Sequence, residues 1–501
     1  MRPDAWSPLF ARAGTRLPLL PRLPLSPLLL WQLAKRAALF GALLGARYCA
    51  RFCLLFSVLI GTLFFARPAL ADETCNSPYL ANLIKGQEDY LYVWTLGVAG
   101  LGDGWDKLVT LDVNPASPRY GKVIAQAPVG RRGEAHHVGF TDDRRFLWAG
   151  GLEDSRIYVF DVATDPARPR LVRTITDFAS RAGLAGPHTF YALPGRMLIG
   201  ALSNSRDHGG HTGMALYSND GRFLRTIAMP LDHGGDGYGY DIAINPARNA
   251  MLTSSFTGYR NYMRDLGELM KDPAAMQQFG ATMVLWNLKS MQPAQIFQVP
   301  GAPLEIRWSL REGDDWAMTA SALTSTLWLI KKDETGQWQA KSVGLIGDPS
   351  KLPLPVDISI SADGKALWVN TFMDGTTRRF DLSNPEAPKQ TYAKHTGSQV
   401  NMVSQSWDGS RVYISSSLLS KWDKKGIEDE QFVKRFAWDG LQLTETWKVD
   451  FYKAKLGRAH HMKLGARRAA ATARGASLPI VQAVQAVQTM HALVDRSLTA
   501  R

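Results

Sequence analysis

The stretch Glu134-Ala-His-His-Val-Gly-Phe140 decides the fold, because the hairpin that it opens recurs along the chain. It continues as Thr-Asp-Asp-Arg-Arg-Phe-Leu-Trp-Ala-Gly, where polar turn residues separate two apolar runs. Residues 356–369 and 401–414 repeat this frame with Asp-Gly in the middle. Asp-Gly supplies the positive φ of a tight turn, and alternating apolar residues are typical of strands. We therefore expect a fold built from antiparallel hairpins.

A second short apolar strand motif occurs seven times, starting at residues 108, 157, 214, 283, 327, 377 and 433. The spacings fit four-stranded propeller blades of about 40–50 residues, some with insertions. The sequence therefore predicts an all-β, seven-bladed β-propeller. The longest spacing contains a helix-like stretch at 262–270 and a second helix start at Asp272-Pro273, which predict a short helical insertion. This insertion is either a lid or a packing element.

The first 71 residues have the features of a targeting segment. Arginines precede the apolar run 52–66, and Ala69-Leu-Ala71 forms a small-x-small cleavage site. The rival interpretation is a membrane anchor, which needs roughly 20 apolar residues, whereas Arg67 and Pro68 interrupt this run. We expect an N-terminal extension with a signal peptide at 1–71, the propeller at 72–466, and a tail of no assigned function at 467–501. The mature protein is expected in the periplasm, without stable membrane insertion.

The charge is concentrated outside the expected propeller. Of the net +13, residues 1–71 carry +8 and residues 467–501 carry +4, which leaves +1 for residues 72–466. A nearly neutral body argues against nucleic-acid binding. Of the three cysteines, Cys49 and Cys53 lie in the expected signal segment, so only Cys75 remains. A single cysteine excludes an internal disulfide, and it is either a reactive thiol or a packed chain-end residue.

The front residues of the inner strands carry the functional prediction. In a propeller the innermost strand of each blade lines the central channel, so residues distant in sequence converge there. Aligned by their turns, the seven candidate inner strands begin with mostly imidazole or carboxylate side chains. These front residues are His137 (beside His136), His188, Asp241, Glu305, Asp357, Met402 (beside Asn401) and His460 (beside His461).

Converging imidazoles predict a transition-metal site formed by His136, His137, His188 and His460. A thioether beside histidines suits copper, whereas imidazole with carboxylate also suits zinc or iron. The carboxylates could instead orient the imidazoles, or bind a hard cation such as calcium as a second metal. Any single channel histidine could equally be a structural residue held by hydrogen bonds. The prediction of a metal site therefore depends on the four histidines together. His208-Gly-Gly-His211 is a weaker candidate pair in a flexible turn.

Several motifs, in the same order, resemble the selenium-binding protein family, whose members include the bacterial methanethiol oxidases. The motifs include Glu134-Ala-His-His, Gly237-Tyr-Gly-Tyr-Asp241, Pro303-Leu-Glu-Ile-Arg307, Ser417-Leu-Leu-Ser-Lys-Trp-Asp423 and Gly457-Arg-Ala-His460. The resemblance runs from about residue 75 to residue 465. It implies a seven-bladed propeller and an exported, copper-dependent enzyme. It also implies oxidation of methanethiol with O2 and water to formaldehyde, hydrogen sulfide and hydrogen peroxide. Vertebrate members carry Cys-x-x-Cys after the paired histidines, where this chain has Thr141-Asp-Asp-Arg-Arg145.

From the resemblance we expect copper held by the four histidines, with methanethiol bound as the thiolate and O2 as electron acceptor. One of Asp241, Glu305 and Asp357 is expected to accept a proton as catalytic base. Two other functions fit the same channel: a non-catalytic carrier of copper or of a selenium or sulfur species, and a scaffolding propeller without metal. The expected partners are a small thiol and O2.

Overall fold

The computed structural model describes residues 77–424 and 431–467. The predicted signal peptide, Cys75 and all of the predicted tail except Arg467 lie outside these ranges. Within them, no helix is both long enough and apolar enough to cross a membrane.

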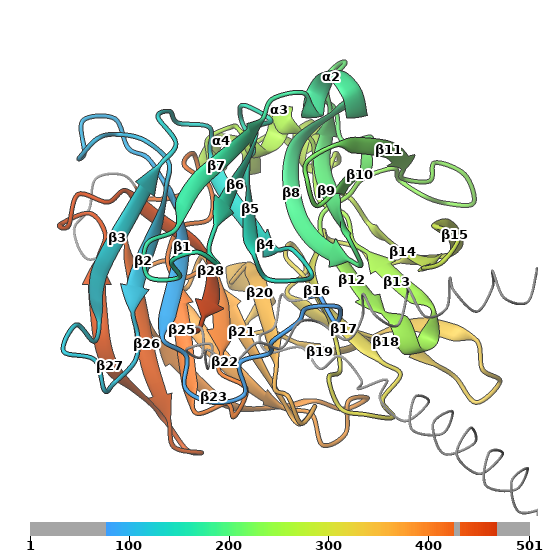
Figure 1. Cartoon of the computed structure of the whole chain (residues 1–501). Coiled ribbons are helices and arrows are strands. Elements are labelled where there is room, and N and C mark those ends of the chain that lie inside the picture. The colour runs from blue at the N-terminus through green and yellow to red at the C-terminus, as the bar shows by residue number, and fades with distance from the viewer. Residues whose placement is uncertain (1–76, 425–430, 468–501) are drawn as a thin grey trace, which may run out of the picture. The chain divides into compact units, whose positions relative to one another are not determined.

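The described chain forms a seven-bladed β-propeller of four-stranded antiparallel sheets (Figure 1). The innermost strands are β28 (Arg458–Gly465), β4 (Ala135–Phe140), β8 (Leu184–Leu193), β12 (Ile242–Asn245), β16 (Pro303–Trp308), β20 (Pro355–Ile360) and β24 (Val403–Gln405). The second strands are β1 (Tyr90–Leu96), β5 (Phe146–Gly151), β9 (Arg196–Asn204), β13 (Ala250–Thr253), β17 (Ala317–Ser321), β21 (Ala366–Thr371) and β25 (Arg411–Ser415).

The third strands are β2 (Lys107–Asp112), β6 (Ile157–Asp161), β10 (Gly213–Ser218), β14 (Thr282–Asn287), β18 (Thr326–Lys332), β22 (Thr376–Asp381) and β26 (Phe432–Trp438). The outermost strands are β3 (Lys122–Pro128), β7 (Arg170–Ile175), β11 (Phe223–Ala228), β15 (Gln292–Gln298), β19 (Trp338–Leu345), β23 (Lys389–His395) and β27 (Leu443–Asp450). The seven-copy motif of the sequence is the third strand of each blade, so the predicted repeat is confirmed.

The predicted hairpins are also confirmed, as the pairs β4–β5, β20–β21 and β24–β25. In two of them the turn glycine has a positive φ, +68° at Gly364 and +69° at Gly409. In the first hairpin Arg144 takes this place with a φ of +54°. The turn position therefore requires the left-handed region whether or not glycine occupies it.

The ring closes without a covalent link. The last strand, β28, pairs antiparallel with β1 and occupies the inner position of the blade that continues into β2 and β3. Because the two ends of the propeller share one sheet, opening the ring would leave both strands with unpaired backbone groups. This closure also brings residues 458–465 to the channel.

The core lies between the blades. The inner strands are almost wholly buried, because neighbouring blades cover both of their faces, whereas outer strands such as β3 and β7 are partly exposed. Four tryptophans are among the largest fully buried side chains: Trp94, Trp148, Trp286 and Trp368.

Short helices interrupt the strands: α2 (Phe178–Ala182), α3 (Tyr259–Tyr262), α4 (Leu266–Met270), α5 (Pro273–Met276), η1 (Pro246–Arg248) and η2 (Pro349–Lys351). The insertion between β13 and β14 holds α3, α4 and α5. The single helix predicted over 262–270 is wrong, because Asp265 starts a new helix there. Its side chain accepts hydrogen bonds from the N–H groups of Gly267 and Glu268 at the start of α4. The predicted helix start at Asp272-Pro273 is confirmed as α5.

The insertion packs on the channel end of the propeller. Tyr262 and Leu269 belong to the same buried apolar cluster as Leu304 and Trp422, which come from other blades. The insertion thereby covers residues that adjoin the inner strands.

Candidate metal centre in the central channel

A β-bulge in five inner strands brings pairs of consecutive side chains to the channel. In β4, three residue steps from Ala135 to Val138 face two steps on β5, which leaves one extra residue at His136-His137. The same shift occurs around 188–189 in β8, 304–305 in β16, 356 in β20 and 460–461 in β28. A bulge breaks the alternation of side chains between the faces of a strand. In β4 and β28 both histidines of the pair can therefore lie on the channel side, and all four of these histidines are buried.

Hydrogen bonds between neighbouring inner strands show which positions are equivalent. The Ile306 N–H donates to Asp241 (2.8 Å), the Val403 N–H to Asp357 (2.8 Å) and the Val138 N–H to His461 (3.1 Å). We call this set the second channel position: His137, Thr189, Asp241, Glu305, Asp357, Met402 and His461. The residues just before them form the first channel position: His136, His188, Tyr240, Leu304, Val356, Asn401 and His460.

This alignment corrects the one made from the sequence. His188 and His460 were aligned with His137, but they are equivalent to His136. The cause is the bulge, whose extra residue cannot be read from the apolar pattern. The four predicted histidines still converge, from β4, β8 and β28.

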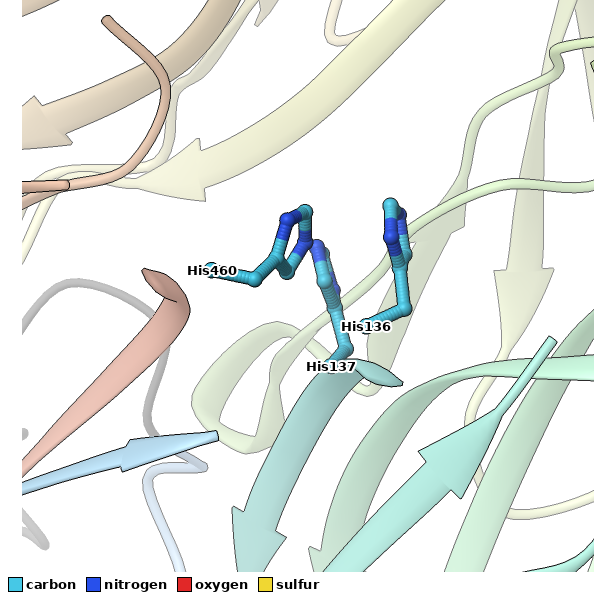
Figure 2. Close-up of side chains that lie close together, drawn as sticks. All are labelled: His136, His137 and His460. Atoms are coloured by element: carbon cyan, nitrogen blue, oxygen red, sulfur yellow. The ribbon is translucent and has the colours of Figure 1, made fainter. Parts of the chain in front are cut away.

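The histidine rings are in direct contact (Figure 2). The ring centroid of His136 lies 3.9 Å from that of His460 and 4.8 Å from that of His137, and His137 lies 4.0 Å from His188. Two sets of three residues each bring their possible metal-donor atoms within 4.8 Å of one another. One set is His136, His137 and His460, and the other is His137, His188 and Glu305.

The hydrogen bonds of the rings determine which nitrogens are free. Nδ1 of His460 donates to the Ser417 carbonyl (2.8 Å), and Nδ1 of His188 donates to the Tyr240 carbonyl (3.1 Å). In a neutral ring, the opposite nitrogen, Nε2, then carries a lone pair. Neither Nε2 has a hydrogen-bond partner in the described structure, and Nδ1 of His136 has none. Buried lone pairs that point together fit a metal that takes imidazole ligands, such as copper, zinc or iron.

His461 has a different role from its neighbours. Its Nδ1 accepts the hydrogen bond from Val138, so in the neutral ring Nε2 carries the hydrogen and offers no lone pair. Its ring centroid lies 4.5 Å from that of His137. His461 therefore joins β28 to β4 and packs against a candidate ligand.

Burial keeps the imidazoles neutral. Desolvation, followed by the neighbouring imidazoles, lowers the pKa of His136 and His137 well below the usual value, and desolvation lowers that of His188 as well. Desolvation lowers the pKa of His460 to about 3. Neutral imidazole is the form that binds metals.

The three predicted carboxylates surround one guanidinium, that of Arg307, which was not predicted as a site residue. Arg307 forms ion pairs with Asp241 (3.0 Å), Glu305 (2.9 Å) and Asp357 (2.9 Å), and its side chain is 5% exposed. A hard cation among these groups would meet that positive charge. Arg307 lies two residues after Glu305 on β16. A basic residue at this spacing from a channel carboxylate was the sequence signal for the ion pair.

Glu305 differs from the two aspartates. Asp241 and Asp357 use both oxygens in hydrogen bonds, including those from Ile306 and Val403. Oε1 of Glu305 has no hydrogen-bond partner and lies 3.6 Å from Nε2 of His137. Desolvation, followed by the charge of Asp241, raises the pKa of Glu305 well above its usual value. Glu305 is thus the carboxylate with a free oxygen beside the histidines.

A loop after β25, Ser417–Asp423, supports the first channel position. The Ser417 carbonyl accepts from His460, and the Leu418 backbone forms a hydrogen bond with His136. Glu134 holds this loop from the start of β4. Its Oε1 accepts from the Ser420 N–H (2.7 Å), and its Oε2 accepts from the Ser420 hydroxyl (2.5 Å).

Other sequence candidates lie outside this cluster. Met402 is buried in an apolar cluster with Val433, Tyr413 and Met462. His208 and His211 are exposed and are also absent from the two donor sets found among the described residues. The place of the vertebrate Cys-x-x-Cys is the turn that begins at Thr141, whose hydroxyl donates to Asp143.

Comparison with known proteins finds relatives over the whole propeller. The sequence model of the 56 kDa selenium-binding protein (SBP56) matches residues 70–470. A methanethiol oxidase from Hyphomicrobium sp is 63% identical over 401 residues, which cover 80% of this chain and 92% of the relative. A methanethiol oxidase from Ruegeria pomeroyi is 54% identical over 409 residues, which cover 79% and 94%.

A solved structure supports the fold. The hypothetical selenium-binding protein from Sulfolobus tokodaii is 24% identical, with a TM-score of 0.66 over 75% of this chain and 93% of that chain. Because the family match and both relatives span most of its length, the chain belongs to the 56 kDa selenium-binding protein family.

Proposed function

We propose that this protein is a copper-dependent methanethiol oxidase. With 63% and 54% identity to two proteins of that name over most of its length, the chain is an oxidoreductase that acts on a thiol. The proposed reaction converts methanethiol, O2 and water to formaldehyde, hydrogen sulfide and hydrogen peroxide. The methyl carbon is oxidised by two electrons, and O2 accepts them to become peroxide.

The observation that carries the proposal is the cluster of buried, unpartnered imidazole nitrogens in the channel. Nε2 of His188, Nε2 of His460 and Nδ1 of His136 lack hydrogen-bond partners, and His137 belongs to both sets of donors. These four residues would hold the copper. A bound copper would supply a soft site for a thiolate and a redox partner for O2.

The chain's own groups have distinct roles in this proposal. The Ser417 and Tyr240 carbonyls keep the hydrogens of His460 and His188 on Nδ1 and so direct Nε2 of each ring to the centre. Glu305 accepts a proton from the methyl carbon or from the attacking water through its free Oε1. Arg307 holds the other oxygen of Glu305 and so orients the carboxylate.

We also propose that the protein works after export. The support is the sequence of residues 1–71, with its apolar run and its small-x-small site before Asp72. Sequencing the N-terminus of protein recovered from the periplasm tests this proposal, and a retained residue 1 would contradict it.

The test of the function combines metal analysis with product analysis. The exported protein, produced in copper-replete medium, should contain near-stoichiometric copper and release sulfide and peroxide in equal amounts from methanethiol. The variants His137→Ala and His188→Ala should lose most of the copper and the activity while keeping the circular dichroism of the strands. His208→Ala, in an exposed turn, is the matched control.

Two outcomes would contradict the proposal. Full copper content in both variants would exclude these histidines as ligands. Copper binding without peroxide release would indicate a carrier instead of an enzyme.

A further inference from the structure

Apolar space adjoins the candidate metal centre at His136. We call it the inner pocket; its lining includes His136, Tyr240, Phe256, Leu304, Val356 and Trp422. Leu304, Val356 and Tyr240 occupy the first channel position on three of the four blades that carry no histidine there, and Asn401 occupies it on the fourth. The first channel position is therefore imidazole on one side of the channel and mostly apolar on the other.

The inner pocket is small. It offers about 20 Å³ to the centre of a water-sized molecule. About 10–15 Å³ of such space holds one water, and an apolar cavity of this kind has too few polar partners to hold water well. The space therefore suits a small apolar molecule of at most two heavy atoms, such as one carbon bonded to one sulfur.

A second small apolar space, the outer pocket, lies against the helical insertion and adjoins the inner pocket through shared lining residues. It offers about 10 Å³ on the same measure, and its lining includes Leu266, Met270 and Met373. Met270 and Met373 are each 42% exposed, so the outer pocket lies just below the surface of the molecule. The two pockets share Phe279, Leu323, Leu354 and Trp422 in their linings.

We propose that the two pockets form an apolar entry route through which a neutral, small thiol reaches His136, and that the inner pocket limits its alkyl group to one carbon. This inference rests on the proposed function. It gives the helical insertion a role, because α4 and α5 supply Leu266, Met270 and Met276 to the outer pocket. Methanethiol and O2 are both small and weakly polar, so both favour such a route over water.

Leu323 is the position at which the route can be closed. Leu323 is half-buried and lines both pockets. A larger side chain at this position can therefore fill the space where the two pockets adjoin. Leu323→Trp should lower kcat/KM for methanethiol by at least about tenfold, mainly through KM, with unchanged copper content. Leu345→Trp, at a side chain that is 60% exposed on β19, is the matched control.

The size limit has its own variant. Phe279→Ala enlarges both pockets, so it should raise kcat/KM for ethanethiol relative to methanethiol by about tenfold, since one methylene is worth 10–200-fold in an apolar pocket. An unchanged ratio of the two thiols in this variant would overturn the size limit.

A second readout does not depend on activity. Crystals pressurised with xenon should show the gas in the inner pocket of the wild type and the Leu345→Trp protein, and not in Leu323→Trp. No xenon in the wild type, or an unchanged kcat/KM in Leu323→Trp, would overturn the route while leaving the proposed function intact. If the copper-loaded wild type oxidises no methanethiol, the proposed function fails, and the xenon result alone decides the route.

Discussion

The three carboxylates of the second channel position share Arg307, yet their remaining contacts separate them. Asp241 and Asp357 accept backbone N–H groups from the next blade, which joins adjacent inner strands. Glu305 keeps one oxygen free beside His137. The two aspartates thus stabilise the contacts between neighbouring blades, whereas Glu305 has an oxygen available at the candidate metal centre.

Glu305→Gln is expected to lower kcat for methanethiol by about 10²-fold, because it removes the proton acceptor while preserving size. Copper content, measured on the same sample, should stay at the wild-type level. Asp357→Asn is the matched comparison. It should cost about 2 kcal/mol in the free energy of unfolding, because its amide would face backbone N–H groups. Wild-type kcat in Glu305→Gln would exclude Glu305 as the base.

At the scale of the elements, the loop Ser417–Asp423 connects the histidines of the candidate metal centre to Glu134, which lies outside that centre. Glu134 has a φ of +62°, an uncommon conformation for a residue with a side chain, and this conformation accompanies its two hydrogen bonds to Ser420. The same loop contributes the carbonyl that orients His460 and the side chain of Trp422 in the inner pocket. A change at Glu134 should therefore reach the metal ligands through the loop.

Glu134→Ala is expected to weaken copper binding by about 10–100-fold, the usual cost of losing a group that orients a metal ligand. Competition titration with a copper chelator measures the Kd, and circular dichroism checks that the strands remain. Glu153→Ala, at an exposed carboxylate in the same blade, should leave the Kd unchanged. Equal affinities for both variants would show that the loop does not position the histidines.

At the scale of the whole molecule, the seam between the first and last blades includes a buried ion pair. Glu88, just before β1, accepts two hydrogen bonds from Nε of Arg411 on β25 (2.8 and 3.0 Å) and one from the Tyr413 hydroxyl. Glu88 is fully buried. Removing one partner of such a pair leaves an uncompensated buried charge.

Glu88→Ala is expected to lower the free energy of unfolding by about 3–5 kcal/mol. Asp408 also pairs with Arg411, at 3.1 Å, but its side chain is 51% exposed, so Asp408→Ala should cost less than about 1 kcal/mol. Urea unfolding followed by tryptophan fluorescence compares the two variants. A smaller loss in Glu88→Ala than in Asp408→Ala would contradict a structural role for the buried pair.

The sequence by itself determined the seven blades, the third-strand repeat and the histidines and carboxylates of the channel. These features depend on local chemistry: apolar alternation, turn residues with positive φ, and polar side chains where a strand start is normally apolar. Such patterns span only a few consecutive residues, so they can be recognised in the sequence alone. For the same reason the break at Asp265 was missed, since the apolar pattern continues through it.

Only the tertiary structure decided which residues share a position and which nitrogens are free. The bulges bring His136 and His137 to the same side, although strand alternation would separate them. The pairing of Arg307 with Asp241 and Asp357 on the neighbouring blades, and the hydrogen bonds of Glu134 to Ser420, join residues 50 to 286 positions apart. These contacts arise from ring closure, which places strands side by side irrespective of their distance along the chain, and no local pattern encodes that placement.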